Sequence, residues 1–161
     1  SLTKEAGSVQ SEISEEDALK IRYPSFEDEN LDQAVQDVVK QLRENTDGED
    51  TVIDYRSKTI FDTYTSVLFK ITKTAEDGST KISYASMLYD GNAQKALSVD
   101  DVFRNQVERE LLDGRKLDDV TAMELDEKDV TLYFSNGKSL PSDFSEHKVY
   151  IALNDTDLPS L

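Results

Sequence analysis

The sequence has no cysteine, no tryptophan and one histidine, His147, among its 161 residues. Without cysteine the chain can form no disulfide, no thiolate zinc site and no thiol nucleophile, which suits either the cytoplasm or an exported protein. One imidazole cannot supply the histidine clusters of common hydrolytic zinc sites. We therefore expect no catalytic residues, no metal and no cofactor in this chain, and we interpret His147 as a surface or strand-edge residue.

Positive charge is also scarce, because 18 Lys and Arg residues face 34 Asp and Glu residues, which leaves a net charge of -16. Such a chain repels the phosphates of nucleic acids and anionic membrane surfaces. We exclude DNA and RNA as partners. The charge serves either solubility or attraction to a basic protein or a cation.

Long apolar runs are missing as well. No stretch approaches the roughly 18 apolar residues that a membrane span needs, and no signal peptide precedes Leu2. We expect a soluble chain without membrane contact of its own. Because Ser1 is not preceded by methionine, we also expect it to be a piece of a longer protein.

The composition changes near residue 20. Residues 1–20 are mostly Ser, Glu, Lys, Gln and Gly, which repay little of the entropy lost on ordering, so they predict a flexible tail or linker. The following residues contain the Val, Leu, Ile, Tyr and Phe of a core. A single domain is therefore predicted over residues 21–161.

Two segments have helical periodicity. The first has apolar residues at the offsets of one helix face, with Asn30 as the expected N-cap, Gln33 placed to reach back and an end at residues 45–48. The apolar positions are Leu31, Ala34, Val35, Val38, Val39 and Leu42. A second helix is expected from Ser98, with Asp101 as the reciprocal cap, as far as Leu111.

Alternating apolar residues predict strands elsewhere. A long strand over residues 61–71 has Val67, Phe69 and Ile71 on one side and Tyr64 and Leu68 on the other, and the turn residues 76–79 should join it to a strand over 81–89. Further strands are expected over 51–56, 130–134 and 148–153. The predicted class is α+β, an antiparallel β-sheet with two main helices packed on it.

The sequence motifs give little support to a catalytic or metal-binding function. No Gly-x-Ser-x-Gly elbow, glycine-rich phosphate loop or EF-hand loop is present. A carboxylate-based hydrolase would need two acids facing each other across a cleft. The adjacent carboxylates are Glu15 with Glu16, Asp100 with Asp101, and Asp118 with Asp119. The oxygen-rich loops considered for calcium hold Asp47, Glu49 and Asp50, or Asn154, Asp155 and Asp157, and turn and capping roles explain them.

Tyrosines at strand spacing leave two interpretations open. Tyr84, Tyr89, Tyr133 and Tyr150 could stack on sugar rings if they formed an exposed platform, or they could belong to the sheet core, as such residues more often do.

The string KISYASMLYDGNAQKALSVDDVF, residues 81–103, combines an alternating strand, a turn with glycine and a helix start. It resembles the extracytoplasmic domain, of the DUF3298 and DUF4163 type, of RsiV-like lysozyme-sensing anti-sigma factors and of the noncatalytic N-terminal region of Gram-positive peptidoglycan deacetylases. Tyr23-Pro24, VTLYFSNGK at 130–138 and KVYIALND at 148–155 extend the resemblance over about residues 21–161. Many members carry a Gly-Ala-His element where this chain has Ala75 to Ser79.

The resemblance implies a noncatalytic, extracellular or cell-surface module of a polysaccharide deacetylase. Such a module positions a catalytic domain following Leu161 or contacts cell-wall glycan, and a membrane anchor lies elsewhere in the protein. The alternative is a sensor that binds a basic protein such as lysozyme. A candidate binding surface comprises Tyr84, Tyr89, Asn92 and Gln94.

Overall fold

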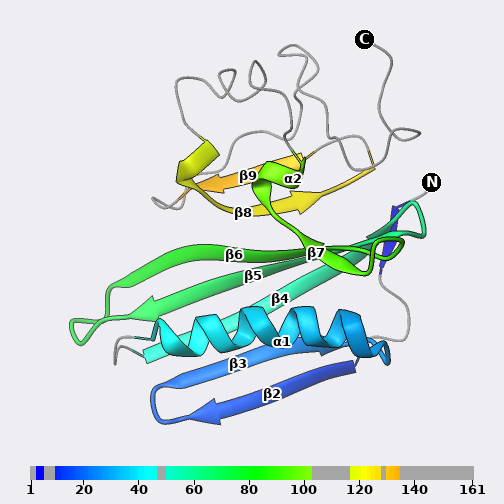
Figure 1. Cartoon of the computed structure of the whole chain (residues 1–161). Helices are drawn as coiled ribbons and strands as arrows, with labels where there is room; N and C mark the ends of the chain where they lie inside the picture. Colours follow the sequence, from blue (N-terminus) through cyan, green and yellow to red (C-terminus); the bar gives the residue numbers. More distant parts are fainter. Residues whose placement is uncertain (1–2, 6–9, 47–49, 103–116, 128–129, 135–161) are drawn as a thin grey trace.

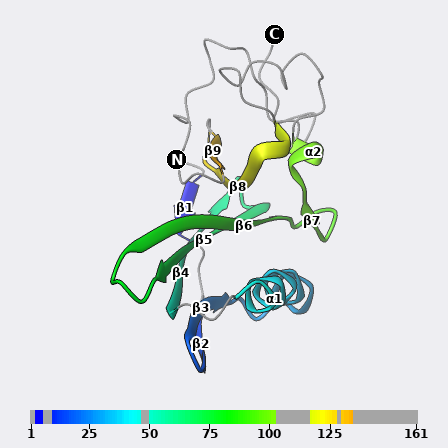
Figure 2. The same cartoon turned by 90° about the vertical axis from the view of Figure 1, so that its left-hand side faces the viewer.

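The structure, a computed structural model, describes residues 3–5, 10–46, 50–102, 117–127 and 130–134. Figure 1 shows three layers: the helix α1, a large β-sheet, and a small β-hairpin on the sheet face opposite α1. Figure 2 shows the sheet bending around the helix.

The large sheet has seven strands in the order β2-β3-β4-β5-β6-β7, with β1 also paired to β4. Its strands are β1 (Thr3–Glu5), β2 (Gln10–Glu16), β3 (Leu19–Ser25), β4 (Asp50–Ile60), β5 (Tyr64–Thr74), β6 (Thr80–Asp90) and β7 (Lys95–Leu97). Only β3 and β4 pair in parallel, with α1 between them in the chain; the other described pairs are antiparallel. The predicted α+β class is confirmed.

Helix α1 (Glu29–Glu44) buries the predicted apolar face against one side of the sheet. Its N-cap is Asp28 and not Asn30, because the Asp28 carboxylate accepts a hydrogen bond of 3.1 Å from the Leu31 N–H. Asn45 is the C-cap, with a φ of -95°, so the helix ends within the predicted residues 45–48.

The predicted tail over residues 1–20 is wrong for residues 3–5, which form β1, and for residues 10–20, which form β2, a turn and the start of β3. The seven residues of β2 pair one to one with those of β3, and Asp17 adopts a φ of 42° in the turn between them. Hydrogen bonds between backbones thus order a strand whose polar side chains face water, a case that apolar periodicity does not detect.

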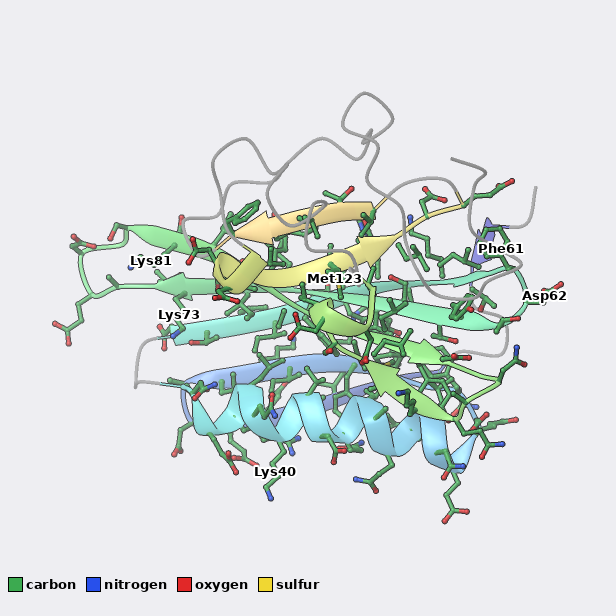
Figure 3. The ribbon with its side chains drawn as sticks, turned by 45° about the horizontal axis from the view of Figure 1, so that its top comes forward. Lys40, Phe61, Asp62, Lys73, Lys81 and Met123 are labelled. Atoms are coloured by element: carbon green, nitrogen blue, oxygen red, sulfur yellow. The ribbon has the colours of Figure 1, made fainter. Side chains whose placement is uncertain are left out.

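The predicted strands in the middle of the chain are confirmed with shifted ends. Phe61 and Asp62 have φ values of 56° and 54° in the turn between β4 and β5, so β5 begins at Tyr64 (Figure 3). The predicted alternation holds, since Val67 and Phe69 pack towards α1 while Tyr64 packs on the opposite face. Lys73 and Lys81 are paired at the far end of β5 and β6.

The hairpin consists of β8 (Val120–Leu125), which follows a short 3-10 helix (Leu117–Asp119), and β9 (Val130–Phe134). The sequence predicted β9 but not β8. Strand β8 contacts the large sheet through its backbone edge. The Met123 and Leu125 N–H groups donate to the Ser86 and Ser66 hydroxyls at 2.8 and 3.1 Å. Both of its faces are therefore covered, and Ala122 to Leu125 are all buried without alternation.

Two apolar cores lie on opposite sides of the sheet. The core on the α1 side comprises Leu19, Ile21, Leu31, Val35, Val39, Ile53, Val67, Phe69, Met87 and Tyr89. The core on the hairpin side comprises Ile60, Tyr64, Leu88, Val102, Met123, Leu125, Val130, Leu132 and Phe134. Met123 lies on β8 above the sheet (Figure 3), so the hairpin supplies much of the second core.

Helix α2 (Val99–Val102) begins where the sequence predicted a second helix. The Ser98 hydroxyl accepts a bond of 3.2 Å from the Asp101 N–H, and the Asp101 carboxylate accepts one of 2.8 Å from the Ser98 N–H. The predicted continuation to Leu111 and the strand over residues 148–153 lie outside the described residues. No helix among those described combines the length and apolar character needed to cross a membrane.

Gly91 ties two turns of the sheet together. Its N–H donates to the Thr63 carbonyl at 2.8 Å, and a Cβ on Gly91 would lie 2.7 Å from that oxygen. Gly91→Ala should therefore lower the free energy of unfolding by about 1–3 kcal/mol in urea titrations, because backbone must move. Asn92→Ala, at the exposed neighbouring residue, is the control and should change it little. Equal stability of Gly91→Ala and the unmodified chain would contradict this contact.

Candidate functional site

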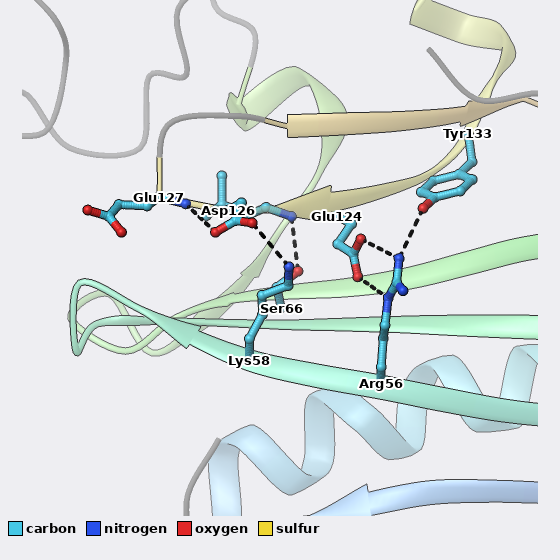
Figure 4. A network of polar contacts seen from close by, with 8 residues as sticks. Arg56, Lys58, Ser66, Glu124, Asp126, Glu127 and Tyr133 are labelled. Atoms are coloured by element: carbon cyan, nitrogen blue, oxygen red, sulfur yellow. Dashed lines mark hydrogen bonds and ion pairs between the residues drawn. The ribbon is translucent and has the colours of Figure 1, made fainter. Parts of the chain in front are cut away.

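The strongest polar contact in the described residues joins the large sheet to the hairpin (Figure 4). Arg56 on β4 donates from Nε and a terminal nitrogen to the two carboxylate oxygens of Glu124 on β8, at 2.6 and 2.7 Å. The Glu124 side chain is 9% exposed and that of Arg56 is 65% exposed. The hydrogen bond to Glu124 raises the pKa of Arg56, so the guanidinium stays charged.

Tyr133 on β9 extends this network. A terminal nitrogen of Arg56 lies 3.5 Å from its hydroxyl, and burial raises the pKa of Tyr133. The Tyr133 ring packs against that of Tyr84 on β6, with the centroids 4.4 Å apart and the planes tilted by 40°. The two tyrosines and the ion pair thus hold the hairpin to two strands of the sheet, β4 and β6.

A second contact stands beside the first. Lys58 on β4 lies 3.4 Å from the Asp126 carboxylate at the end of β8 (Figure 4). Together with the two serine hydroxyls that accept from the Met123 and Leu125 N–H groups, it attaches the second half of that strand.

The chemistry of this network is that of attachment. Glu124 is the buried acidic residue of the described part, and both of its oxygens accept hydrogen bonds from one guanidinium. A bidentate, charge-assisted pair of this kind fixes the positions of both side chains, so the carboxylate serves to hold the hairpin on the sheet. Within the described ranges, no group of three or more Asp, Glu, His or Cys residues is arranged to hold a metal ion.

A smaller polar cluster fills the gap where β3 and β4 diverge beyond their paired residues. Arg22 donates to the Asp54 carboxylate at 2.6 Å, and its guanidinium lies 4.9 Å from the centre of the Tyr55 ring. The Ser11 and Tyr55 hydroxyls are 2.6 Å apart. All of these side chains reach solvent, so the cluster closes the sheet without forming a buried site.

The structure does not bring the four predicted surface residues together. Tyr84 and Tyr89 lie on opposite faces of β6, and Tyr89 is buried in the α1-side core with 4% of its surface exposed. Asn92 and Gln94 lie in the exposed turn after β6, where Gln94 accepts a hydrogen bond from the Asn30 amide at 2.8 Å. The odd separation of the two tyrosines along a strand predicts their opposite orientation.

The paired carboxylates are also separated or engaged. Glu15 and Glu16 point to opposite faces of β2, and Asp101 caps α2. Asp118 and Asp119 are exposed on the 3-10 helix, and Asp50 begins β4. The other candidates, His147, Tyr150, Asp47, Glu49, Asn154, Asp155 and Asp157, lie outside the described residues.

Part of the sheet face that carries the hairpin is open to solvent. We call it the open sheet surface; it comprises Val52, Lys70, Thr72, Ile82 and Tyr84. Val52 pairs with Thr72 and Thr72 with Ile82 across the strands, and Lys70 pairs with Tyr84 in the next row. Val52 is 53% and Ile82 40% exposed. Apolar side chains in one cross-strand row form a flat surface suited to contact with another molecule.

Among the comparisons with known proteins, the one with solved structures finds a similar architecture. No family model matches the chain, and no curated protein does. A solved structure of a DUF3298 family protein from Pseudomonas aeruginosa PAO1 superimposes with a TM-score of 0.56 at 13% identity, over 99% of this chain and 97% of that one. The chain has the fold of that DUF3298 family protein. The part of the expected resemblance that concerns the fold is thereby confirmed.

No sequence signal pointed to the Arg56–Glu124 pair, whose members are 68 positions apart. Arg56→Met should lower the free energy of unfolding by about 2–3 kcal/mol, because it leaves a buried carboxylate without its partner. Glu124→Gln should cost only about 1 kcal/mol, since the exposed Arg56 is hydrated by water. Urea titration measures both.

Replacing both members, Arg56→Met with Glu124→Met, should recover most of the loss, because no buried charge remains. Lys58→Met removes the partner of Asp126, whose carboxylate is 50% exposed; it is the matched control and should cost less than about 1 kcal/mol. If Glu124→Gln proves as costly as Arg56→Met, the buried carboxylate is not the reason for the effect.

Proposed function

We propose that this chain is a noncatalytic, extracytoplasmic accessory module of a cell-wall-associated polysaccharide (peptidoglycan) deacetylase. In this role it positions a catalytic domain or contacts the wall. Deacetylation itself would belong to a separate zinc-binding domain, because the single histidine cannot supply the ligands.

The observation that carries the proposal is the folding of the string on which the resemblance rests. Its described part, residues 81–102, forms most of β6, a turn, β7 and α2, the order of strand, turn and helix that the resemblance implies. The shared DUF3298 fold is consistent with this origin. The roles of Glu124 and Asp101 in attachment and capping also favour a module without chemistry of its own.

The open sheet surface is the wall contact that we propose. It combines exposed apolar side chains with the hydroxyl groups of Thr72 and Tyr84 and the ammonium group of Lys70, which suit the apolar faces and polar edges of sugar rings. Tyr84 is half-buried against Tyr133, so its ring is held in place before any ligand binds.

The 161-residue chain should sediment with purified peptidoglycan and should release no acetate from N-acetylglucosamine polymers in the presence of zinc. Val52→Ser with Ile82→Ser should weaken sedimentation severalfold, because apolar contact area is lost. Gln36→Ser, on the exposed side of α1, is the control and should bind as the unmodified chain does. Measurable acetate release, or equal binding by the double variant, would contradict the proposal.

A second candidate function is a sensor that binds a basic protein such as lysozyme. The observation that favours it is the net charge of -16, together with exposed carboxylates on β2 and on the first turn of α1.

Calorimetry with lysozyme tests this second function. Binding heat at low ionic strength should fall strongly as salt rises, because the attraction between opposite charges is screened. Bovine serum albumin, an acidic protein, serves as the control and should give no heat. The absence of heat with lysozyme at low salt would count against the sensor.

A further inference from the structure

The two outer strands of the large sheet differ in how they are protected. At one side β7 has three residues and leads directly into α2. At the other side β2 has seven residues in unbroken register with β3, and no described strand pairs with its outer edge (Figures 1 and 2). In an antiparallel pair, about half of the residues of an outer strand direct their N–H and C=O groups away from the sheet.

Strand β2 also lacks several of the usual features that prevent strand addition, and its charged side chains are all acidic. Its sequence, QSEISEE, contains no proline and no lysine, and its pairing shows no bulge. Outer strands of soluble proteins commonly carry such features because an unprotected edge recruits other chains. The described structure thus presents a regular edge to which an extended segment can add.

The side chains of β2 indicate the chemistry of that segment. Ile13, 58% exposed, lies opposite Arg22 and so on the sheet face away from α1. Glu12 and Glu16 are exposed on the other face. A complementary strand therefore carries an apolar residue on the Ile13 face and basic residues on the Glu12 and Glu16 face.

Charge also argues against a second copy of this chain as the partner. Each β2 carries three carboxylates and no basic residue, so two paired edges would bring six together, three from each copy. Like charges on paired strands destabilise the pairing. A basic segment gains from the same carboxylates that repel a second copy.

We infer that the outer edge of β2 binds an extended segment of a partner protein in which basic and apolar residues alternate, as an additional strand of the sheet. The backbone hydrogen bonds of the added strand provide affinity, and its alternating side chains provide selectivity. This inference deepens the second candidate function by naming a surface, and it does not involve the open sheet surface.

The probe is a capped peptide of the sequence Thr-Lys-Val-Lys-Val-Lys-Thr, titrated into the full chain at low salt. Amide shifts in nuclear magnetic resonance spectra should concentrate in residues 10–16 and spare the outer face of α1. Replacing each lysine of the peptide with glutamate should abolish binding. No binding of the lysine peptide at low salt would overturn the inference.

Variants of the chain separate local from general attraction. Glu12→Gln, Glu15→Gln and Glu16→Gln together should weaken the lysine peptide about fivefold to tenfold, because Glu12 and Glu16 face the lysines and Glu15 adds its charge from the other face of β2. The matched control changes exposed α1 residues by the same charge: Glu29→Gln, Asp37→Asn and Glu44→Gln. It should have little effect. Equal weakening by both triple variants would show general attraction and overturn the inference.

Peptide backbone methylation tests strand addition directly. Two peptides are used: one is methylated on the backbone nitrogens of its odd-numbered residues, the other on those of its even-numbered residues. Only the peptide whose methylated nitrogens point to β2 should lose binding, because a strand directs alternate N–H groups to opposite sides. If both methylated peptides bind as the parent does, the segment does not add as a strand. A chain that binds the peptide but not lysozyme would keep this inference and reject lysozyme as the partner.

Discussion

The attachment of β8 to the large sheet by its backbone edge is the constraint on which the hairpin side of the molecule depends. The hydroxyls of Ser66 and Ser86 accept hydrogen bonds from β8, and Arg56 holds Glu124 beside them. Because β8 stands on its edge, apolar side chains from both of its faces can be buried. These polar contacts set the position of the strand whose Met123 and Leu125 side chains contribute to the second core.

The same constraint defines the surfaces that are available for binding. The hairpin covers one part of the sheet face and leaves Val52 and Ile82 exposed beside it, while α1 covers the opposite face. The edge of β2 lies beyond both. The wall contact and the added strand that we propose therefore use separate surfaces, and one protein could engage both together.

Acidic residues have different structural roles in different parts of the molecule. Asp28, Asp32 and Asp101 accept hydrogen bonds from backbone N–H groups at the starts of helices, where a carboxylate is favoured by the helix dipole. Glu124 is paired in the interior. The carboxylates on β2 have neither role. Glu15 lies 3.9 Å from Lys20, and Glu12 and Glu16 are exposed on the outer strand to which we propose that a basic segment adds.

The sequence by itself determined the elements whose signal is local. The apolar face of α1, the alternation of β5 and the cap of Ser98 with Asp101 each depend on neighbours a few residues apart, and each is confirmed. Only the tertiary structure decided the rest. Strand β2 is held by backbone pairing and β8 is buried on both faces, so neither has a periodic pattern, and Arg56 meets Glu124 across 68 positions of chain. The sequence predicts that Tyr84 and Tyr89 point to opposite faces of β6. The tertiary structure decided that Tyr84 packs against the hairpin and that Tyr89 is buried on the α1 side.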